Sequence, residues 1–371
     1  MSYTSTITAV LSLLQLAGFA PPAETAPLVD RIISGAQEAG DPAPSLQAIS
    51  SLSQLLAAGA RLGADVPRRL GSIVADPRAH GVVRVELIKL LCSHGSPEDA
   101  ERVRVLITEL IARLRALPDH HDPEYYALPG ILQAFLEEGA QRLAPRLADP
   151  ASLLDVYMNV LAGPRSRFNE WVQQPCFDRI VDNPAPLPVR QRYMLRVVET
   201  VSFYVYPEPF AKLVNQDVSA PLRKIAFEGA AGPNGYHPTA VALLAEYGDE
   251  ETADRLMELG KQRGYLEADM TRVGGDVWRI RVHYDTQLLL DYIGSDQWID
   301  WSTRAWAVQK ALRLGVEKSK IREALLEYGS HASSNKRLGA EARDVLQIAV
   351  ENGILMPGEL PVTPLPSWAR P

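Results

Sequence analysis

The chain has 371 residues, with 38 Lys and Arg against 45 Asp and Glu, and therefore a formal net charge of −7. Hydrophobic residues make up 46% of it and charged residues 22%, which are ordinary values for a globular protein. This composition excludes a disordered or collagen-like chain, and the acidic balance argues against a protein that binds nucleic acids mainly by electrostatics. The length suits two domains or one elongated repeat array.

The N-terminal segment from Ile7 to Ala20 is apolar, but no Lys or Arg precedes it. A secretory signal normally begins with basic residues, so we expect an amphipathic first helix that caps the fold. No apolar run reaches the ~20 residues that a membrane span requires, so no membrane association is expected. The two cysteines, Cys92 and Cys176, show no CxxC or metal-type spacing, which favours buried thiols in a reducing compartment. We therefore predict a cytoplasmic protein.

Residues 76–114 have the pattern of two helices joined by a tight turn. The first helix should end at His94-Gly95, because glycine accepts the left-handed conformation that follows many helices. Ser96 is then expected as the N-cap of the second helix and Pro97 as its first residue. The apolar residues of the second helix recur at helical spacing and predict its buried face: Ala100, Val103, Ile107, Leu110, Ile111 and Leu114.

The same turn recurs along the chain. Residues 90–103 can be laid over residues 243–256 without a gap, and this aligns Gly95 with Gly248. Fainter copies of the pattern lead to Gly139 and Gly329. The separations between these four glycines are 44, 109 and 81 residues, which fit a period of ~40 if the middle interval holds an insertion.

The stretch from Asp76-Pro77 through the Val83-Arg84 helix to the Gly95-Ser96-Pro97-Glu98 turn resembles a HEAT repeat, closest to the bacterial kind found in phycobilisome-lyase-type proteins. The resemblance is good over about 40 residues and fair again at 239–259. It implies an all-α, right-handed α-solenoid of about eight or nine helical pairs over residues 1–356, whose first and last helices act as caps.

Two regions depart from this helical pattern. Between residues 265 and 284, Trp278, Ile280, Val282 and Tyr284 alternate with polar residues after Gly274-Gly275, which predicts a small β-hairpin inserted between helices. Residues 357–371 contain 5 prolines in 15 positions and predict an extended C-terminal tail.

Aromatic residues concentrate in two groups, around residues 193–210 and 265–306. Such rings serve either to anchor a binding partner or to fill space where elements pack. If the rings of the predicted hairpin point inward, Arg279, Arg281 and His283 should face solvent. The candidate partner-binding residues are therefore aromatic residues of these two regions and the two arginines that the hairpin would expose: Tyr204, Tyr206, Arg279, Arg281, Tyr284, Trp298 and Trp301.

One stretch has the chemistry of metal ligands, the Pro118–Tyr126 segment with His120 and His121. Adjacent histidines rarely converge on one ion, so an ordinary solvated loop is the favoured interpretation and no metal is predicted. The HEAT-like di-iron enzyme deoxyhypusine hydroxylase is marked by His-Glu dipeptides, and this chain has none. The sequence also has no phosphate-binding or nucleophile-elbow motif, and no cofactor is predicted.

We therefore predict a protein–protein interaction scaffold or adaptor, with an inhibitor or immunity-type binder as one specialised form. The alternative is a HEAT-like DNA glycosylase or another enzyme that acts on nucleic acids, since such glycosylases use Trp and Asp, and Trp298, Asp300 and Trp301 supply these types. The charge is uneven: residues 304–344 contain 9 basic and 5 acidic residues, whereas residues 249–300 contain 6 and 12. A bilin lyase is a third possible function, suggested only by the resemblance to phycobilisome-lyase-type repeats.

Overall fold

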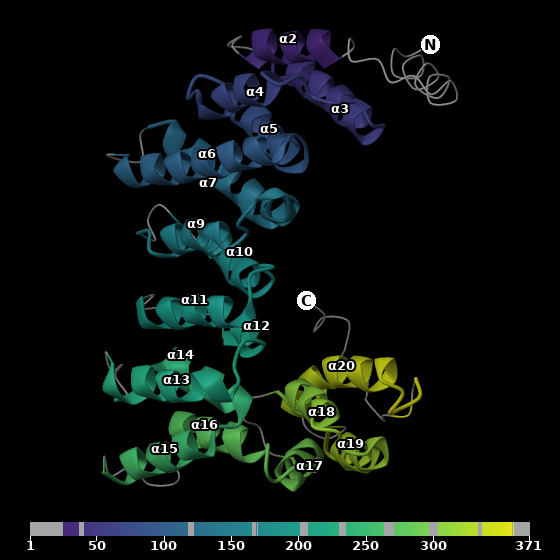
Figure 1. Ribbon diagram of the computed structural model, residues 1–371. Helices are drawn as coiled ribbons and strands as arrows, with labels where there is room; N and C mark the ends of the chain where they lie inside the picture. Colours follow the sequence, from purple (N-terminus) through teal and green to yellow (C-terminus); the bar gives the residue numbers. More distant parts are fainter. Residues whose placement is uncertain are drawn as a thin grey trace. The chain divides into compact units, whose positions relative to one another are not determined.

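A computed structural model describes residues 25–36, 41–117, 122–164, 168, 170–200, 207–229, 235–262, 271–296, 303–332, 336–357 and 359. Every regular element among these residues is a helix, which confirms the predicted all-α class in the described part of the chain (Figure 1). None of these helices is long and apolar enough to cross a bilayer. The predicted first helix at residues 7–20 lies outside the described residues.

The chain divides into two compact units, residues 1–213 and 214–371. The helices of unit 1 are α2 (Thr25–Ala36), α3 (Ala43–Ala57), α4 (Val66–Ala75), α5 (Gly81–Ser93), α6 (Pro97–Ala116), α7 (Glu124–Ala134), the π-helix η2 (Phe135–Gly139), α8 (Ala140–Leu143), the 3₁₀ helix η3 (Ala144–Arg146), α9 (Ser152–Leu161), α10 (Glu170–Val181), α11 (Leu187–Thr200) and α12 (Pro207–Ala211). The helices of unit 2 are α13 (Gln216–Glu228), α14 (Pro238–Tyr247), α15 (Glu250–Gln262), α16 (Thr271–Arg281), α17 (Gln287–Gly294), α18 (Arg304–Arg313), α19 (Lys318–Ala332) and α20 (Lys336–Glu351). The single array expected over residues 1–356 stays a prediction.

Unit 1 consists of two layers of helices. The helices α3, α5, α7 and α10 pack side by side in one layer, and α4, α6, α9 and α11 pack side by side in the other (Figure 1). Two contacts show that α5 and α7 run parallel. Arg84 pairs with Glu124 near the starts of the two helices, and Lys89, in the second half of α5, pairs at 3.2 Å with Glu138 of η2, which follows α7. Successive helix pairs in this unit are therefore stacked, as expected for a helical repeat.

The predicted unit at residues 76–114 is confirmed as α5, a tight turn and α6. Gly95 has a φ of +111°. Ser96 caps α6 by accepting from the Asp99 backbone N–H at 3.2 Å, while the Asp99 carboxylate accepts from the Ser96 N–H at 2.9 Å, so the two form a capping box. All six residues of the predicted apolar stripe on α6 are buried.

The two fainter copies of this turn differ from the prediction. Gly139 ends the π-helix with helical φ and ψ angles, and the chain continues directly into α8. A Cβ atom added at Gly139 would lie 2.8 Å from the Cys92 sulfur, so glycine is required there for close helix packing. Gly329 lies inside α19 and is buried. Glycine at these two positions therefore lies within helical structure, whereas at Gly95 and Gly248 it follows the end of a helix.

The predicted β-hairpin is wrong over the part of residues 265–284 that the structure describes, because residues 271–281 form helix α16. The alternation of Trp278, Ile280 and Val282 fits a strand, but Val277 and Ile280 also stand at helical spacing and both are buried. Gly275 is buried as well, and α16 packs against α14 and α15. Gly274 and Gly275 therefore lie within a helix and form no turn.

The C-terminal tail is described only at Pro357 and Glu359 beyond residue 356. The Glu359 carboxylate pairs with Arg322 of α19 at 2.7 Å and accepts from the Met356 N–H at 2.7 Å. The first residues of the tail therefore lie against unit 2. The rest of the predicted tail is outside the described residues.

Basic side chains recurrently bind the carbonyl groups at helix C-termini. Arg146 donates to the carbonyls of Leu91 (2.9 Å), Cys92 (2.7 Å) and His94 (2.6 Å) at the end of α5. Arg113 donates in the same way to the Ala75 carbonyl at the end of α4, at 2.7 Å. The last carbonyls of a helix lack partners inside the helix, and a cation is favoured at that end of the helix dipole.

The most enclosed charge cluster in unit 1 joins α5, α6 and α7. Arg84 is fully buried, donates from Nε to the Val74 carbonyl at 2.8 Å and pairs with the Glu124 carboxylate, which Arg113 also contacts at 2.7 Å. Removal of one member of a buried pair leaves an uncompensated charge in a poorly solvated place.

We expect the substitution Glu124→Gln to destabilise the protein by about 3–5 kcal/mol, because two arginines then lose their carboxylate. The free energy of unfolding can be measured by urea denaturation. The control is Glu101→Gln, which removes a more exposed pair with Arg104 and should cost less than about 1 kcal/mol. Equal losses in the two variants would contradict a structural role for the buried cluster.

Candidate functional site

Three of the predicted partner-binding residues, Arg279, Arg281 and Tyr284, lie in or just after the last turn of α16 in unit 2. Tyr204, Tyr206, Trp298 and Trp301 lie outside the described residues, and so do His120 and His121. Tyr284 contacts the turn that joins α14 to α15, and two cations from other helices also bind there.

The turn itself is determined by two adjacent residues. Gly248 follows α14 with a φ of +86°, in the left-handed region that other residues rarely adopt. Asp249 then starts α15, and its carboxylate accepts from the Thr252 backbone N–H at 3.0 Å and from the Thr252 hydroxyl at 2.7 Å. The Gly-Asp pair therefore ends one helix and caps the next.

Two cations from other helices hold this turn in place. Arg223 of α13 pairs with Asp249 at 2.5 Å and with Glu251 at 3.0 Å. Lys310 of α18 is only 4% exposed, and its ammonium donates to both the backbone carbonyl and the side chain of Glu246, each at 3.2 Å. Burial lowers the pKa of Lys310, although Glu246 opposes that shift. Since Glu246 lies near the end of α14, these two hydrogen bonds hold the start of the turn against α18.

Tyr284 and His283 cover the turn from the end of α16. The Tyr284 hydroxyl donates to the Gly248 carbonyl, yet the residue is 61% exposed. Its pKa is raised by partial burial and by the nearby Glu250 and Asp249 carboxylates. A phenol ring fixed at one end and exposed over most of its surface is suited to contact with a partner.

The two arginines do not behave as the hairpin interpretation expected. Arg281 is exposed, but Arg279 is half-buried, with its guanidinium 5.7 Å from the centre of the Trp306 ring. His283 is also half-buried, packed against Gly248. Residues two apart on a helix point in different directions, so the predicted common solvent face is wrong.

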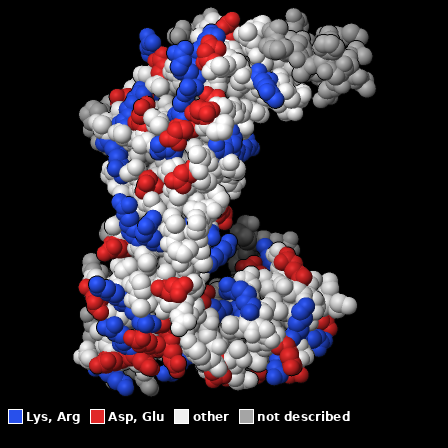
Figure 2. All heavy atoms as spheres, viewed as in Figure 1, with Lys and Arg blue, Asp and Glu red and all other residues white. Residues whose placement is uncertain are grey.

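An acidic and aromatic surface extends from the turn along α15. We define it by Tyr247, Glu250, Asp254, Glu258 and Tyr284, all of which are exposed. The three acids are four residues apart and therefore follow one face of α15. Figure 2 shows Asp and Glu gathered over the α15 region of unit 2.

Sequence reasoning missed Tyr247, Glu250, Arg223 and Lys310. The overlay of residues 243–256 on residues 90–103 already contained the relevant signal, because it marked Gly248-Asp249 as a helix–turn–helix junction. The partners Arg223 and Lys310 are far from the turn in sequence and carry no local pattern.

The basic segment 304–344 contributes less positive surface than its composition suggests. Arg304 is fully buried, lies 5.0 Å and 4.9 Å from the ring centres of Tyr292 and Tyr328, and pairs with Glu341 at 3.1 Å. Lys318 donates to the Asn352 carbonyl at 2.6 Å. Several of these cations are thus committed to internal contacts.

No metal centre is found among the described residues. They contain no group of three or more His, Cys, Asp or Glu side chains that could hold a metal ion. Burial raises the pKa of Cys92 to about 12 and also raises that of Cys176, so both thiols stay protonated at neutral pH.

Comparison with models of known protein families finds no match, and comparison with curated proteins finds none either.

The close packing at Gly248 gives a first prediction for this site. A Cβ atom there would lie 2.5 Å from the His283 ring, and the residue would also have to keep a positive φ. We expect Gly248→Ala to lower the urea midpoint more than Gly315→Ala, because Gly315 also has a positive φ (+76°) but no atom within 4 Å of its added Cβ. Similar losses in the two variants would show that packing against His283 is unimportant.

His283 gives a second prediction, on pH. Burial is the main cause that lowers its pKa from 6.5 to about 4; Lys310 and Arg313 add to the shift, while Glu246 and a backbone hydrogen bond at Ala245 oppose it. Between these two pH values the unfolded chain binds a proton that the folded protein does not, so stability should fall as the pH is lowered from 6.5 towards 4.

The measurement is the free energy of unfolding at pH 7.5 and pH 5 for wild type and His283→Gln, with the exposed His80→Gln as control. The His283→Gln variant should lose less stability on acidification than wild type, and His80→Gln should follow wild type. If the stability of His283→Gln depended on pH as that of wild type does, the His283 imidazole would not be the cause of the loss of stability at low pH.

Proposed function

We propose that the chain is a binding scaffold, a HEAT-like right-handed α-solenoid, that recognises a protein partner through the acidic and aromatic surface of unit 2. The observation that carries this proposal is the exposed Tyr284 ring, which is fixed by its hydroxyl to the Gly248 carbonyl beside the acidic face of α15. The partner segment that fits such a surface is basic and contains apolar or aromatic side chains.

The rigidity of the turn supports this choice. Arg223 and Lys310 brace it from α13 and α18, so little conformational freedom is lost when a partner binds. Tyrosine buries a large area at low rotamer cost, and the three acids of α15 attract a basic segment over a longer range. Arg281, one of the predicted binding residues, is exposed on the last turn of α16 and could meet an acid on the partner.

No described feature favours the alternative function of a nucleic-acid enzyme. Its candidate residues Trp298, Asp300 and Trp301 lie outside the described residues, and the basic segment 304–344 has Arg304 and Lys310 buried. On the face seen in Figure 2, basic and acidic side chains are interspersed. A DNA-binding groove needs clustered Lys and Arg to neutralise phosphates.

The proposed setting is the cytoplasm. Both cysteines are free and buried, and this is the usual state of structural thiols in a reducing compartment.

Charge reversal on α15 tests the proposal. The probe is a labelled peptide rich in Lys and Arg that contains one Trp, with an acidic peptide of the same length for comparison. Wild type should bind the basic peptide alone, and the double variant Asp254→Lys, Glu258→Lys should bind it roughly tenfold more weakly or worse, because like charges then face each other. Fluorescence anisotropy measures both affinities.

The matched control is Glu317→Lys, Glu323→Lys, which makes the same change in net charge at exposed positions of the same unit. This control should bind the basic peptide nearly as wild type does. Equal weakening in both double variants would indicate a net-charge effect and refute a site on α15.

A further inference from the structure

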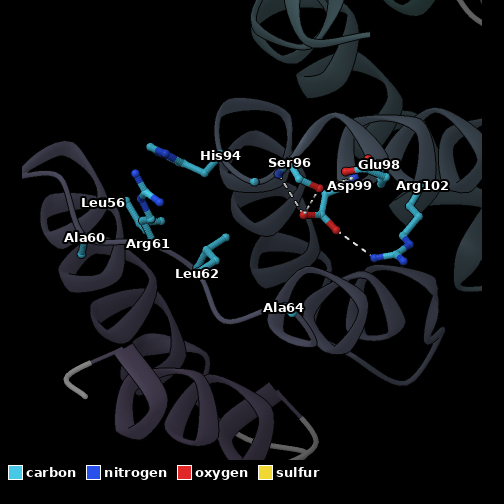
Figure 3. A pocket seen from close by; sticks show the side chains of 11 residues that line it. Leu56, Ala60, Arg61, Leu62, Ala64, His94, Ser96, Glu98, Asp99 and Arg102 are labelled. Atoms are coloured by element: carbon cyan, nitrogen blue, oxygen red, sulfur yellow. Dashed lines mark hydrogen bonds and ion pairs between the residues drawn. The ribbon is translucent and has the colours of Figure 1, made fainter. Parts of the chain in front are cut away.

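A cavity of about 640 Å³ lies in unit 1, between the loop that follows α3 and the turn between α5 and α6. Its volume is within the roughly 300–1,000 Å³ of sites that bind small molecules or short peptide segments. Figure 3 shows His94 and Arg61 on one side of the opening, Ser96, Asp99 and Arg102 on the other, and Leu62 between them.

The wall formed by the α5–α6 turn is rigid. Gly95 has a φ of +111°, and a Cβ atom there would lie 3.0 Å from Asp99 and 3.2 Å from the Arg146 guanidinium. The Arg146 guanidinium donates to the His94 carbonyl at 2.6 Å, and Ser96 and Asp99 form the capping box at the start of α6. The shape of this wall therefore exists before any ligand arrives.

Some charged groups around the cavity already have a partner in the protein, and others do not. Asp99 is buried, with one carboxylate oxygen bonded to Ser96 and the other paired with Arg102 at 2.9 Å. Arg61 is exposed and has no ion pair or hydrogen bond among the described residues. Arg61 is thus the one lining guanidinium without a carboxylate partner in the described part of the chain.

His94 supplies a second polar group beside Arg61. Burial lowers the pKa of His94, and the nearby Arg146 and Arg142 lower it further, so the imidazole is neutral at neutral pH. A neutral imidazole offers one donor and one acceptor. It can therefore donate a hydrogen bond to an anion that Arg61 holds.

The remaining lining is apolar. Leu56, Ala60, Leu62 and Ala64 come from the end of α3 and the loop after it. An aliphatic group on the ligand would cover the apolar surface that these side chains expose to the cavity, which favours binding because that surface is removed from water.

We infer that this cavity binds a carboxylate carried next to an aliphatic group, with the carboxylate on Arg61 and His94 and the aliphatic part on Leu56 and Leu62. A single negative charge fits best, because the Glu98 and Asp99 carboxylates also line the cavity and would repel a dianion such as phosphate. The start of α6 contributes no site, since its own capping residues occupy it.

This chemistry is found both in small aliphatic acids and at the C-terminus of a peptide that ends in Leu. The volume of the cavity leaves room for the last residues of a peptide as well as for the carboxylate. The inference is independent of the surface on α15, because it concerns residues of unit 1 alone.

Calorimetric titration of the full chain tests the inference with four probes: hexanoate, a short peptide that ends in Leu with a free carboxylate, the same peptide with a C-terminal amide, and inorganic phosphate. The free-acid peptide, hexanoate or both should bind, and the amide and phosphate should not. Hexanoate binding as tightly as the peptide would identify a small acid as the ligand, and preference for the peptide would identify a peptide end.

Two variants locate the site. Arg61→Gln should weaken binding of the acids by roughly tenfold, the usual loss for a hydrogen bond to a charged group. Arg31→Gln makes the same charge change at an exposed position of α2 and should bind as wild type does. The NMR signals of the His94 ring should shift on titration with the acid and stay fixed with the amide.

Absence of binding by both acids at millimolar concentration would overturn the inference. Equal affinity of the amide and the acid, tighter binding of phosphate, or an Arg61→Gln variant with wild-type affinity would overturn it as well. The unfolding midpoint of each variant shows whether a lost affinity comes from a lost fold.

Discussion

The structure depends on basic side chains that bind the carbonyl groups at helix ends. Stacked helices joined by short turns leave their last carbonyls partly enclosed, where water cannot satisfy them. Arg146 binds such carbonyls at the end of α5, Arg113 at the end of α4 and Lys310 near the end of α14. In these three cases the cation and the carbonyl are 38 to 64 residues apart in sequence, so each contact also connects helices that are distant in sequence.

This use of cations changes what the composition means. A basic side chain on a helix end inside the stack adds nothing to the surface potential that an approaching partner meets. Arg304 and Lys310 belong to a segment that is basic in sequence, but both are buried. The acids of α15, in contrast, are exposed in a row. This exposed row of acids favours a basic partner.

Local signals made the α5–α6 unit predictable, whereas contacts distant in sequence decided what could not be predicted. Gly95, Ser96 and Pro97 are consecutive, so cap, turn and helix start can be read together. At α16, a short run that alternates Trp278, Ile280 and Val282 fits a strand as well as a helix, and packing on α14 and α15 selects the helix. Gly139 shows the same limit, because only its close approach to Cys92 reveals that it serves packing. For the candidate site, the sequence indicated Arg281 and Tyr284 but not Arg223 or Lys310.

The two sites proposed here occupy the two turns that align best in sequence. At Gly95 and at Gly248 a left-handed glycine is followed by a capping residue, and a distant arginine, Arg146 or Arg223, holds the turn. The two turns differ in the groups beside them. The turn at Gly95 has the neutral imidazole of His94 and the guanidinium of Arg61, whereas the turn at Gly248 has the phenol ring of Tyr284 and the row of acids on α15. The glycine, the capping residue and the arginine are common to the two turns, whereas the groups that face solvent beside them differ. The same framework can thus present an anion site in one unit and a cation-attracting surface in the other.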